Sequence, residues 1–217
     1  MATMVSKENA LAVEDGVPEK GTPQAVRERL IDAASRLFAQ NGFGGVSVRD
    51  ICKSAGTSIN MIHHYFGNKQ GLLDAIVHKY GENVYVVPLR LLASPARSPE
   101  DLSARIEMLL ETTLEACLRD REVMMVALRE QAELPPLTAF QKALVVFLED
   151  AKRNGIVREA LDTEMISGAM LDRIVAQAQY APWIKLTTGV DVVADDAYRR
   201  RWCLANADLF LNGFLDR

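Results

Sequence analysis

Cysteine is scarce in this sequence, and its copies lie far apart. Cys52, Cys117 and Cys203 are odd in number and include no Cys-x-x-Cys pair, so the sequence suggests neither a disulfide framework nor a cysteine zinc site. We expect three reduced, mostly buried thiols. Long apolar runs are also missing. No stretch approaches the roughly 18 residues of a membrane-spanning helix, so we expect no membrane partner.

The N-terminal segment, residues 1–22, is polar and acidic and has no apolar stretch of the kind found in a signal peptide. We therefore expect a disordered arm and a cytoplasmic protein.

Charge is unevenly distributed along the chain. The formal net charge of -4 argues weakly against nucleic-acid binding. Between Gln24 and Tyr80, however, seven Lys and Arg against four Asp and Glu give +3, whereas the chain from Gly81 onward carries -5. A basic module on an acidic body can hold an anionic polymer at one end only.

Apolar residues recur at helical spacing almost throughout, and no segment shows sustained period-two alternation. The sequence therefore predicts an all-α fold: an N-terminal helix-turn-helix module over 23–68 and a larger helical domain over 69–217. Within the larger domain we expect helices over 69–83, ending before Pro88, over 98–120, and over 121–134, stopped by Pro135. Further helices are expected over 137–155, from the Asp162 cap to a break at Pro182, and from about 196 to 216.

Three short helices in about 40 residues, with an Ala-Gly turn between the second and third, are typical of a helix-turn-helix. Ser47 and Asp50 form a capping-box pattern at the second helix. In the third, Ile62 and Phe66 form the expected core pair. The remaining side chains should face outward to meet a partner: Asn60, Met61, His63, His64 and Tyr65.

These motifs, over Arg29–Val77, resemble the N-terminal module of the TetR (tetracycline-repressor-like) transcriptional regulators: "A..LF...G", "S.RDI...AG" and "HYF..K..L". The resemblance covers less than a quarter of the chain. It implies a homodimer that binds double-stranded operator DNA and a small-molecule effector, without a cofactor.

The same resemblance assigns DNA contacts by matching position. Ser47 and Lys69 would bind phosphate, Arg49 would reach a phosphate or a base, and the recognition surface would comprise Ser58, Ile59, Asn60, Met61, His63, His64 and Tyr65. This chain has His63 where the family often has a phosphate-binding tyrosine, so the operator sequence cannot be inferred by analogy. Repression is expected, with activation left open.

Other interpretations carry less weight. His63 and His64 are poor metal co-ligands because adjacent helical residues point about 100° apart. No nucleophile or carboxylate stands at a spacing that suggests an enzyme. A helical protein–protein adaptor without DNA binding is the alternative function. Residues 199–201, three consecutive arginines, are interpreted as a solvated face.

Two further sets of residues are predicted in the C-terminal domain. An effector pocket needs adaptable apolar walls with a few polar anchors, although methionines more often fill a core. The predicted pocket comprises Met108, Met124, Met125, Arg129, Met170, Gln177, Tyr180 and Trp183. The predicted dimer interface comprises Ile166, Met170, Ile174, Leu204, Ala207, Leu211 and Phe214.

Overall fold

The computed structural model describes residues 22–132 and 135–214, and ten helices account for most of this part of the chain. They are α1 (Pro23–Asn41), α2 (Val48–Ala55), α3 (Ile59–Phe66), α4 (Lys69–Leu91), α5 (Pro99–Arg119), α6 (Arg121–Arg129), α7 (Pro135–Arg153), α8 (Thr163–Gln179), α9 (Ala181–Thr188) and α10 (Asp196–Phe214). The described residues contain no strand, and the all-α prediction is confirmed. The predicted arm, residues 1–22, lies outside the described part except for Thr22.

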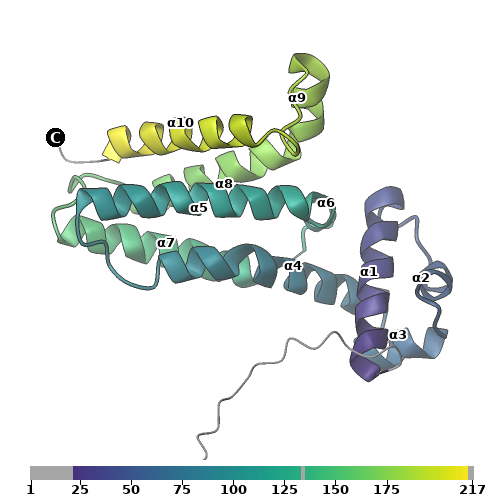
Figure 1. Ribbon diagram of the computed structural model, residues 1–217. Coiled ribbons are helices and arrows are strands. Elements are labelled where there is room, and N and C mark those ends of the chain that lie inside the picture. Colours follow the sequence, from purple (N-terminus) through teal and green to yellow (C-terminus); the bar gives the residue numbers. More distant parts are fainter. Residues whose placement is uncertain (1–21, 133–134, 215–217) are drawn as a thin grey trace, which may run out of the picture.

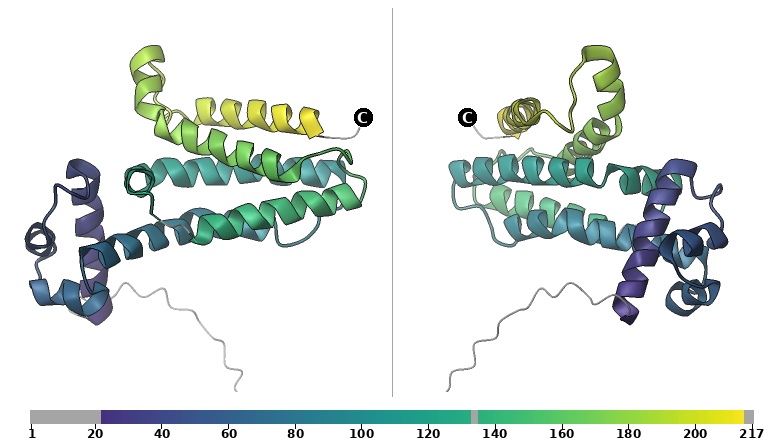
Figure 2. Two further views of the ribbon diagram at one scale, coloured as in Figure 1. Left: turned by 180° about the vertical axis from the view of Figure 1, so that it is seen from behind. Right: turned by 45° about the vertical axis from the view of Figure 1, so that its right-hand side comes forward.

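The helices form a small module at one end of a longer bundle (Figure 1). Helices α1, α2 and α3 make up the module, and α4 leads from it into the bundle. In the bundle α4 packs on α5 and α7, and α8 packs on α5 and α7. Helix α10 lies along α5, and α9 projects away from the bundle in all three views (Figure 2).

Two separate hydrophobic cores match this division, and α4 contributes to both. Its first half places Leu72, Leu73, Ile76 and Val77 in the core of the module. Its second half contributes Tyr80, Val84 and Tyr85 to the core of the bundle. A rigid helix shared by two cores transmits displacement between them, because close-packed interiors deform little.

Helix α4 is longer than predicted, because it continues through Pro88 to Leu91. Proline costs one hydrogen bond, to the carbonyl four residues back. Here it stands in the last turn, where the helix end is held by a tertiary contact: the Arg105 guanidinium donates to the Leu91 carbonyl oxygen at 3.2 Å. The end of the helix is therefore in contact with a residue 14 positions away, which the local proline signal does not reveal.

Helix α6 is shorter than predicted and ends at Arg129 rather than at Pro135. Gln131 adopts a left-handed conformation with φ of 49°, and the Ala132 N–H bonds back to the Ala127 carbonyl. This is a helix-terminating motif that usually employs glycine, so it could not be predicted from a glutamine at this position. The break near Pro182 is confirmed at Tyr180, but the following segment forms the separate helix α9.

Candidate nucleic-acid interface

Short-range polar contacts set the start of α2. The Ser47 Oγ accepts from the Asp50 N–H at 3.2 Å, and the Asp50 carboxylate accepts from the Ser47 N–H at 3.0 Å, which confirms the capping box. The Ser47 hydroxyl also donates to this carboxylate at 2.5 Å. These hydrogen bonds from the Ser47 side chain and backbone hold the pKa of Asp50 below its ordinary value. The hydroxyl of Ser47 is therefore engaged in capping, and its phosphate contact stays a prediction.

The turn between α2 and α3 depends on Gly56, which adopts a left-handed conformation with φ of 63°. The Cys52 thiol donates to the Ser58 carbonyl oxygen across this turn at 3.5 Å. Ser58 occupies the N-cap position of α3, but its side chain makes no capping hydrogen bond. It is exposed, as are Ile59 and Arg49.

Helix α3 is anchored by Ile62, whose side chain is 0% exposed. With 3.6 residues per turn, Asn60 and His64 lie on the side of the helix opposite Ile62, and both are exposed. Met61 and Tyr65 are only half-buried and pack against the module core, which corrects the expectation that both face outward. They flank Ile62 on the same short helix, so the core partly covers them.

The two histidines have different surroundings. His63 Nδ1 lies 2.9 Å from the Gly67 carbonyl oxygen, which ties its ring to the end of α3. The His64 ring is exposed and meets the edge of Tyr65, with ring centroids 4.8 Å apart. In the part of the chain that the structure describes, no group of three or more His, Cys, Asp or Glu is placed to hold a metal ion.

Lys69 at the start of α4 is half-buried and folds back onto the loop between α1 and α2. Its ammonium donates to the carbonyl oxygens of Phe43 at 2.8 Å and Val46 at 2.9 Å, and it lies 4.2 Å from the centroid of the Phe43 ring. An ammonium has three donors, so one remains for a phosphate. The phosphate contact stays a prediction, and the sequence did not indicate the structural role.

The residues predicted to form an effector pocket do not come together. Gln177, Tyr180 and Trp183 line one open cavity of about 740 Å³. Met124 and Met170 are instead buried in the bundle core, Met125 is half-buried and Met108 is exposed. Arg129 lies beside Gly42 at the end of α1, because α6 crosses from the bundle to the module.

The cavity has four lining residues that were not predicted: Arg173, Ala176, Ile184 and Trp202. Arg173, Gln177 and Tyr180 follow one another at helical spacing, so periodicity places them near each other on one side of the chain around the end of α8. That signal was present in the sequence, but the approach of Trp202 from α10 was not.

The predicted dimer interface also needs correction. Met170, Ile174, Ala207 and Leu211 are buried in the core of their own subunit, where α8 and α10 pack against α5. Ile166 is half-buried, Leu204 is exposed, and the side chain of Phe214 lies outside the described part. The apolar stripe of each helix was assigned to a second copy, although α5 already covers it.

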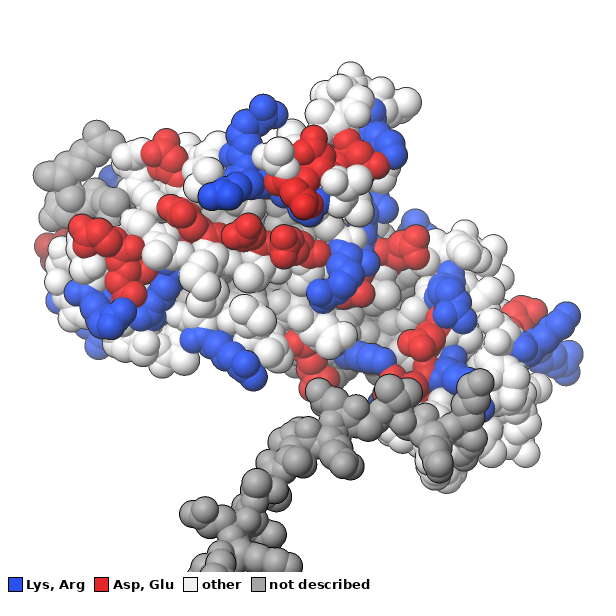
Figure 3. All heavy atoms as spheres, viewed as in Figure 1, with Lys and Arg blue, Asp and Glu red and all other residues white. Residues whose placement is uncertain are grey.

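Acidic side chains form a row along one face of the bundle, whereas lysines and arginines are spread over the visible surface (Figure 3). Glu107, Glu111 and Glu115 follow one another at four-residue spacing on α5, and Figure 3 shows a row of acidic side chains along the bundle. Lysines and arginines recur around the α1–α3 end (Figure 3). By sequence, residues 24–80 carry a net charge of +3 and the chain from Gly81 onward carries -5, which is the imbalance expected of a body that presents one end to an anionic polymer. No helix in the described residues has the length and apolar character to cross a membrane.

Comparison with known proteins shows which family the α1–α3 module resembles. Residues 30–76 match the family described as bacterial regulatory proteins, tetR family. The transcriptional regulator UidR of Escherichia coli (strain K12) is 27% identical over 186 residues, covering 81% of this chain and 86% of its own. The transcriptional repressor KstR2 of Rhodococcus jostii (strain RHA1) is 28% identical over 179 residues, covering 77% and 85%.

The fold of most of the chain has a solved counterpart. The transcriptional regulator FadR of Bacillus subtilis, solved in complex with stearoyl-CoA, superposes with a TM-score of 0.67 at 18% identity, covering 86% of this chain and 98% of that one. The matched module and the helix-turn-helix geometry of α2 and α3 lead to one conclusion: residues 30–76 form a module of the tetR type, and the chain is similar over most of its length to helix-turn-helix transcriptional regulators.

Proposed function

We propose that the protein is a homodimeric repressor that binds a near-palindromic operator through α3 and is released by a small organic effector. The observation that carries DNA recognition is the pair Asn60 and His64, exposed opposite the buried Ile62 on a helix fixed by the Gly56 turn. An asparagine can pair with adenine through two hydrogen bonds, and a histidine ring can reach base edges or phosphates. No catalytic role is proposed.

The repressor assignment and the effector rest on the relatives. KstR2 of Rhodococcus jostii is described as a repressor, and FadR of Bacillus subtilis binds stearoyl-CoA in its solved structure. We infer that a small-molecule effector also regulates DNA binding by this chain. The chemical class of that effector depends on the residues of this chain and not on those of its relatives.

Two helices connect the bundle to the module and would transmit the effector signal. Helix α4 contributes to both cores, as described above. Helix α6 places Val126 and Ala127 in the module core, where it packs on α1. At its other end, the Arg121 guanidinium donates to the carbonyl oxygens of Ala178 at 2.8 Å and Gln179 at 2.9 Å. A shift at the end of α8 would therefore move α6 against α1.

We place the dimer interface on the outer faces of α8 and α10. Met165 and Leu204 are large apolar side chains exposed on these helices, and Leu209 is a third. Large exposed apolar groups on neighbouring elements mark contact surfaces. Two helices from each subunit would form a four-helix bundle, and the two α3 helices would then enter major grooves about 34–36 Å apart.

Footprinting on the DNA upstream of the protein's own gene tests this function. We expect protection of an inverted repeat and an affinity that falls steeply with salt, because each phosphate contact releases counterions. The double variant Asn60→Ala and His64→Ala serves as the matched negative control. Absence of any protected repeat, together with salt-independent behaviour, would favour the protein–protein adaptor.

A further inference from the structure

The open cavity of about 740 Å³ lies where α8, α9 and the start of α10 meet. Its walls are mainly apolar: Ala176 from α8, Ile184 and Trp183 from α9, and Trp202 from α10. Cavities that bind small organic molecules have about this size, and they combine apolar walls with few polar groups. Its position at the end of α8 places it next to the carbonyl groups that Arg121 of α6 contacts.

The polar groups of the cavity are a guanidinium, an amide and a phenol. Arg173 donates through Nε to the amide oxygen of the buried Asn206 on α10. Gln177 donates from its amide nitrogen to the Tyr198 hydroxyl at 3.2 Å. Tyr180 contributes the phenol and is exposed.

The charge of Arg173 lacks a carboxylate partner among the described residues, since none of their ion pairs includes it. Its Nε contacts a neutral amide, and the rest of the planar group retains donors. A guanidinium beside indole rings is suited to a bidentate contact with a carboxylate or sulfonate. The indoles supply flat surfaces on which an aromatic ring can stack.

We propose that this cavity binds a small, flat, apolar molecule that carries one anionic group. Arg173 holds the anion, and Trp183 and Trp202 contact the ring. The inference rests on the proposed function, in that such a molecule would be the class of effector to which the regulator responds. It specifies the ligand by charge and shape.

Intrinsic fluorescence gives a direct test because Trp183 and Trp202 are the only two tryptophans of the chain, and both line the cavity. The probe is anilinonaphthalene sulfonate, a fused aromatic anion. The reference is N-phenylnaphthylamine, which has the same ring system without the charge. We expect the sulfonate to quench tryptophan emission by energy transfer, to saturate, and to bind more tightly than the neutral compound.

The variant Arg173→Gln isolates the anion contact. We expect it to weaken sulfonate binding about tenfold or more, as loss of a charge-assisted hydrogen bond predicts, and to leave binding of the neutral compound within about twofold. Arg153→Gln is the matched control, because it removes the same charge from the end of α7, beside the opposite end of α8. Circular dichroism and thermal unfolding establish that both variants are folded.

Three possible results would contradict the proposed ligand class. Equal affinities for the charged and neutral probes, no saturable quenching, or an unchanged sulfonate affinity in a folded Arg173→Gln variant would each overturn the proposal. These measurements contain no DNA. Operator binding by Arg173→Gln is then measured separately, so that failure of the cavity assignment is distinguished from failure of the DNA-binding function.

Discussion

Among single residues, Asn60 and His64 are the side chains that we propose read the bases. Asn60→Ala or His64→Ala should each cost about 1–3 kcal/mol of binding free energy on the cognate operator and much less on random DNA, because base contacts are lost only at the correct sequence. Fluorescence anisotropy with both duplexes measures the difference. His78→Ala is the control, since this exposed histidine pairs with Glu82 on α4. Equal losses on both duplexes would assign these residues to phosphate contacts.

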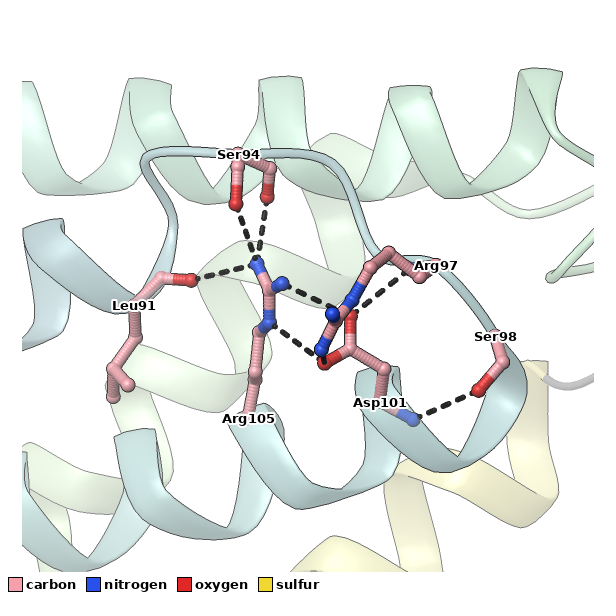
Figure 4. A network of polar contacts seen from close by, with 6 residues as sticks. All are labelled: Leu91, Ser94, Arg97, Ser98, Asp101 and Arg105. Atoms are coloured by element: carbon pink, nitrogen blue, oxygen red, sulfur yellow. Dashed lines mark hydrogen bonds and ion pairs between the residues drawn. The ribbon is translucent and has the colours of Figure 1, made fainter.

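Asp101 at the start of α5 carries a prediction about acid stability. Its carboxylate accepts from the backbone N–H and guanidinium of Arg97 and from Arg105, as Figure 4 shows. These contacts, led by the Arg97 backbone N–H, lower the pKa of Asp101 from 3.8 to about 2. A depressed pKa in the folded state stabilises it above pH 3.8, and this contribution is lost as the pH falls toward about 2.

Thermal unfolding of Asp101→Asn checks this assignment. The variant should melt below the wild type at neutral pH, and the gap should narrow between about pH 4 and pH 2, where the wild-type carboxyl becomes protonated. Asp74→Asn is the matched control, because Asp74 is exposed and, among the described residues, accepts a hydrogen bond only from Gln70 one turn away. A gap that stays constant down to pH 2 would contradict the role of the Asp101 charge.

Among the elements, the junction of α4 with the loop between α1 and α2 depends on Lys69. Lys69→Ala removes the ammonium that donates to the Val46 and Phe43 carbonyl oxygens and leaves Phe43 with only the 3.4 Å bond from the Val46 N–H, so we expect a loss of about 1–3 kcal/mol in the free energy of unfolding. Urea denaturation measures the loss. Lys53→Ala, an exposed lysine on α2, is the control. An unchanged stability would show that the ammonium faces phosphate rather than the loop.

Stability and DNA binding must be separated for Lys69. The phosphate contact predicts weaker binding to every sequence and a flatter salt dependence. Binding is therefore measured at a temperature where the variant is fully folded. A changed sequence preference there would contradict the placement of Lys69 beside the DNA backbone.

In the whole molecule, the proposed interface can be tested through Leu204, which is 47% exposed on α10. Leu204→Arg should leave the subunit folded but bury an unpaired charge twice in a symmetric dimer, so light scattering should report monomers. Leu128→Arg on α6, where the leucine is 43% exposed, is the control. The buried Leu211 is unsuitable, because an arginine there disrupts the core of the subunit itself. A dimeric Leu204→Arg protein would place the interface elsewhere.

Coupling between effector and operator would be a property of the proposed dimer as a whole. An effector that favours a different spacing of the two α3 helices should lower operator affinity about 5- to 150-fold, and operator DNA must weaken the effector by the same factor. Titration of each ligand with and without the other measures both factors. The variant Arg121→Gln loses the contacts to the end of α8 and should therefore reduce both coupling factors. A ligand whose affinity is the same with and without operator DNA would have a structural role and no regulatory one.

Several features of this protein were determined by the sequence alone because they depend on atoms close along the chain. Ser47 and Asp162 cap helices as predicted, and Ser98 caps α5 in the same way, since each side chain accepts a hydrogen bond from a backbone N–H three residues on. The Ala-Gly turn and the burial of Ile62 follow from local pattern in the same way. These short-range signals were sufficient for the all-α fold and for the exposed positions of Asn60 and His64.

Only the tertiary structure decided which partner each helix face meets. An apolar stripe predicts burial but not what covers it, so the stripes of Ile174 and Leu211 were assigned to a second copy although they lie in the subunit core. The end of α4 and the ammonium of Lys69 likewise depend on groups 14 and more than 20 residues away. The cavity with Arg173 and both tryptophans exists only because α8, α9 and α10 converge, since contacts over such separations arise from packing.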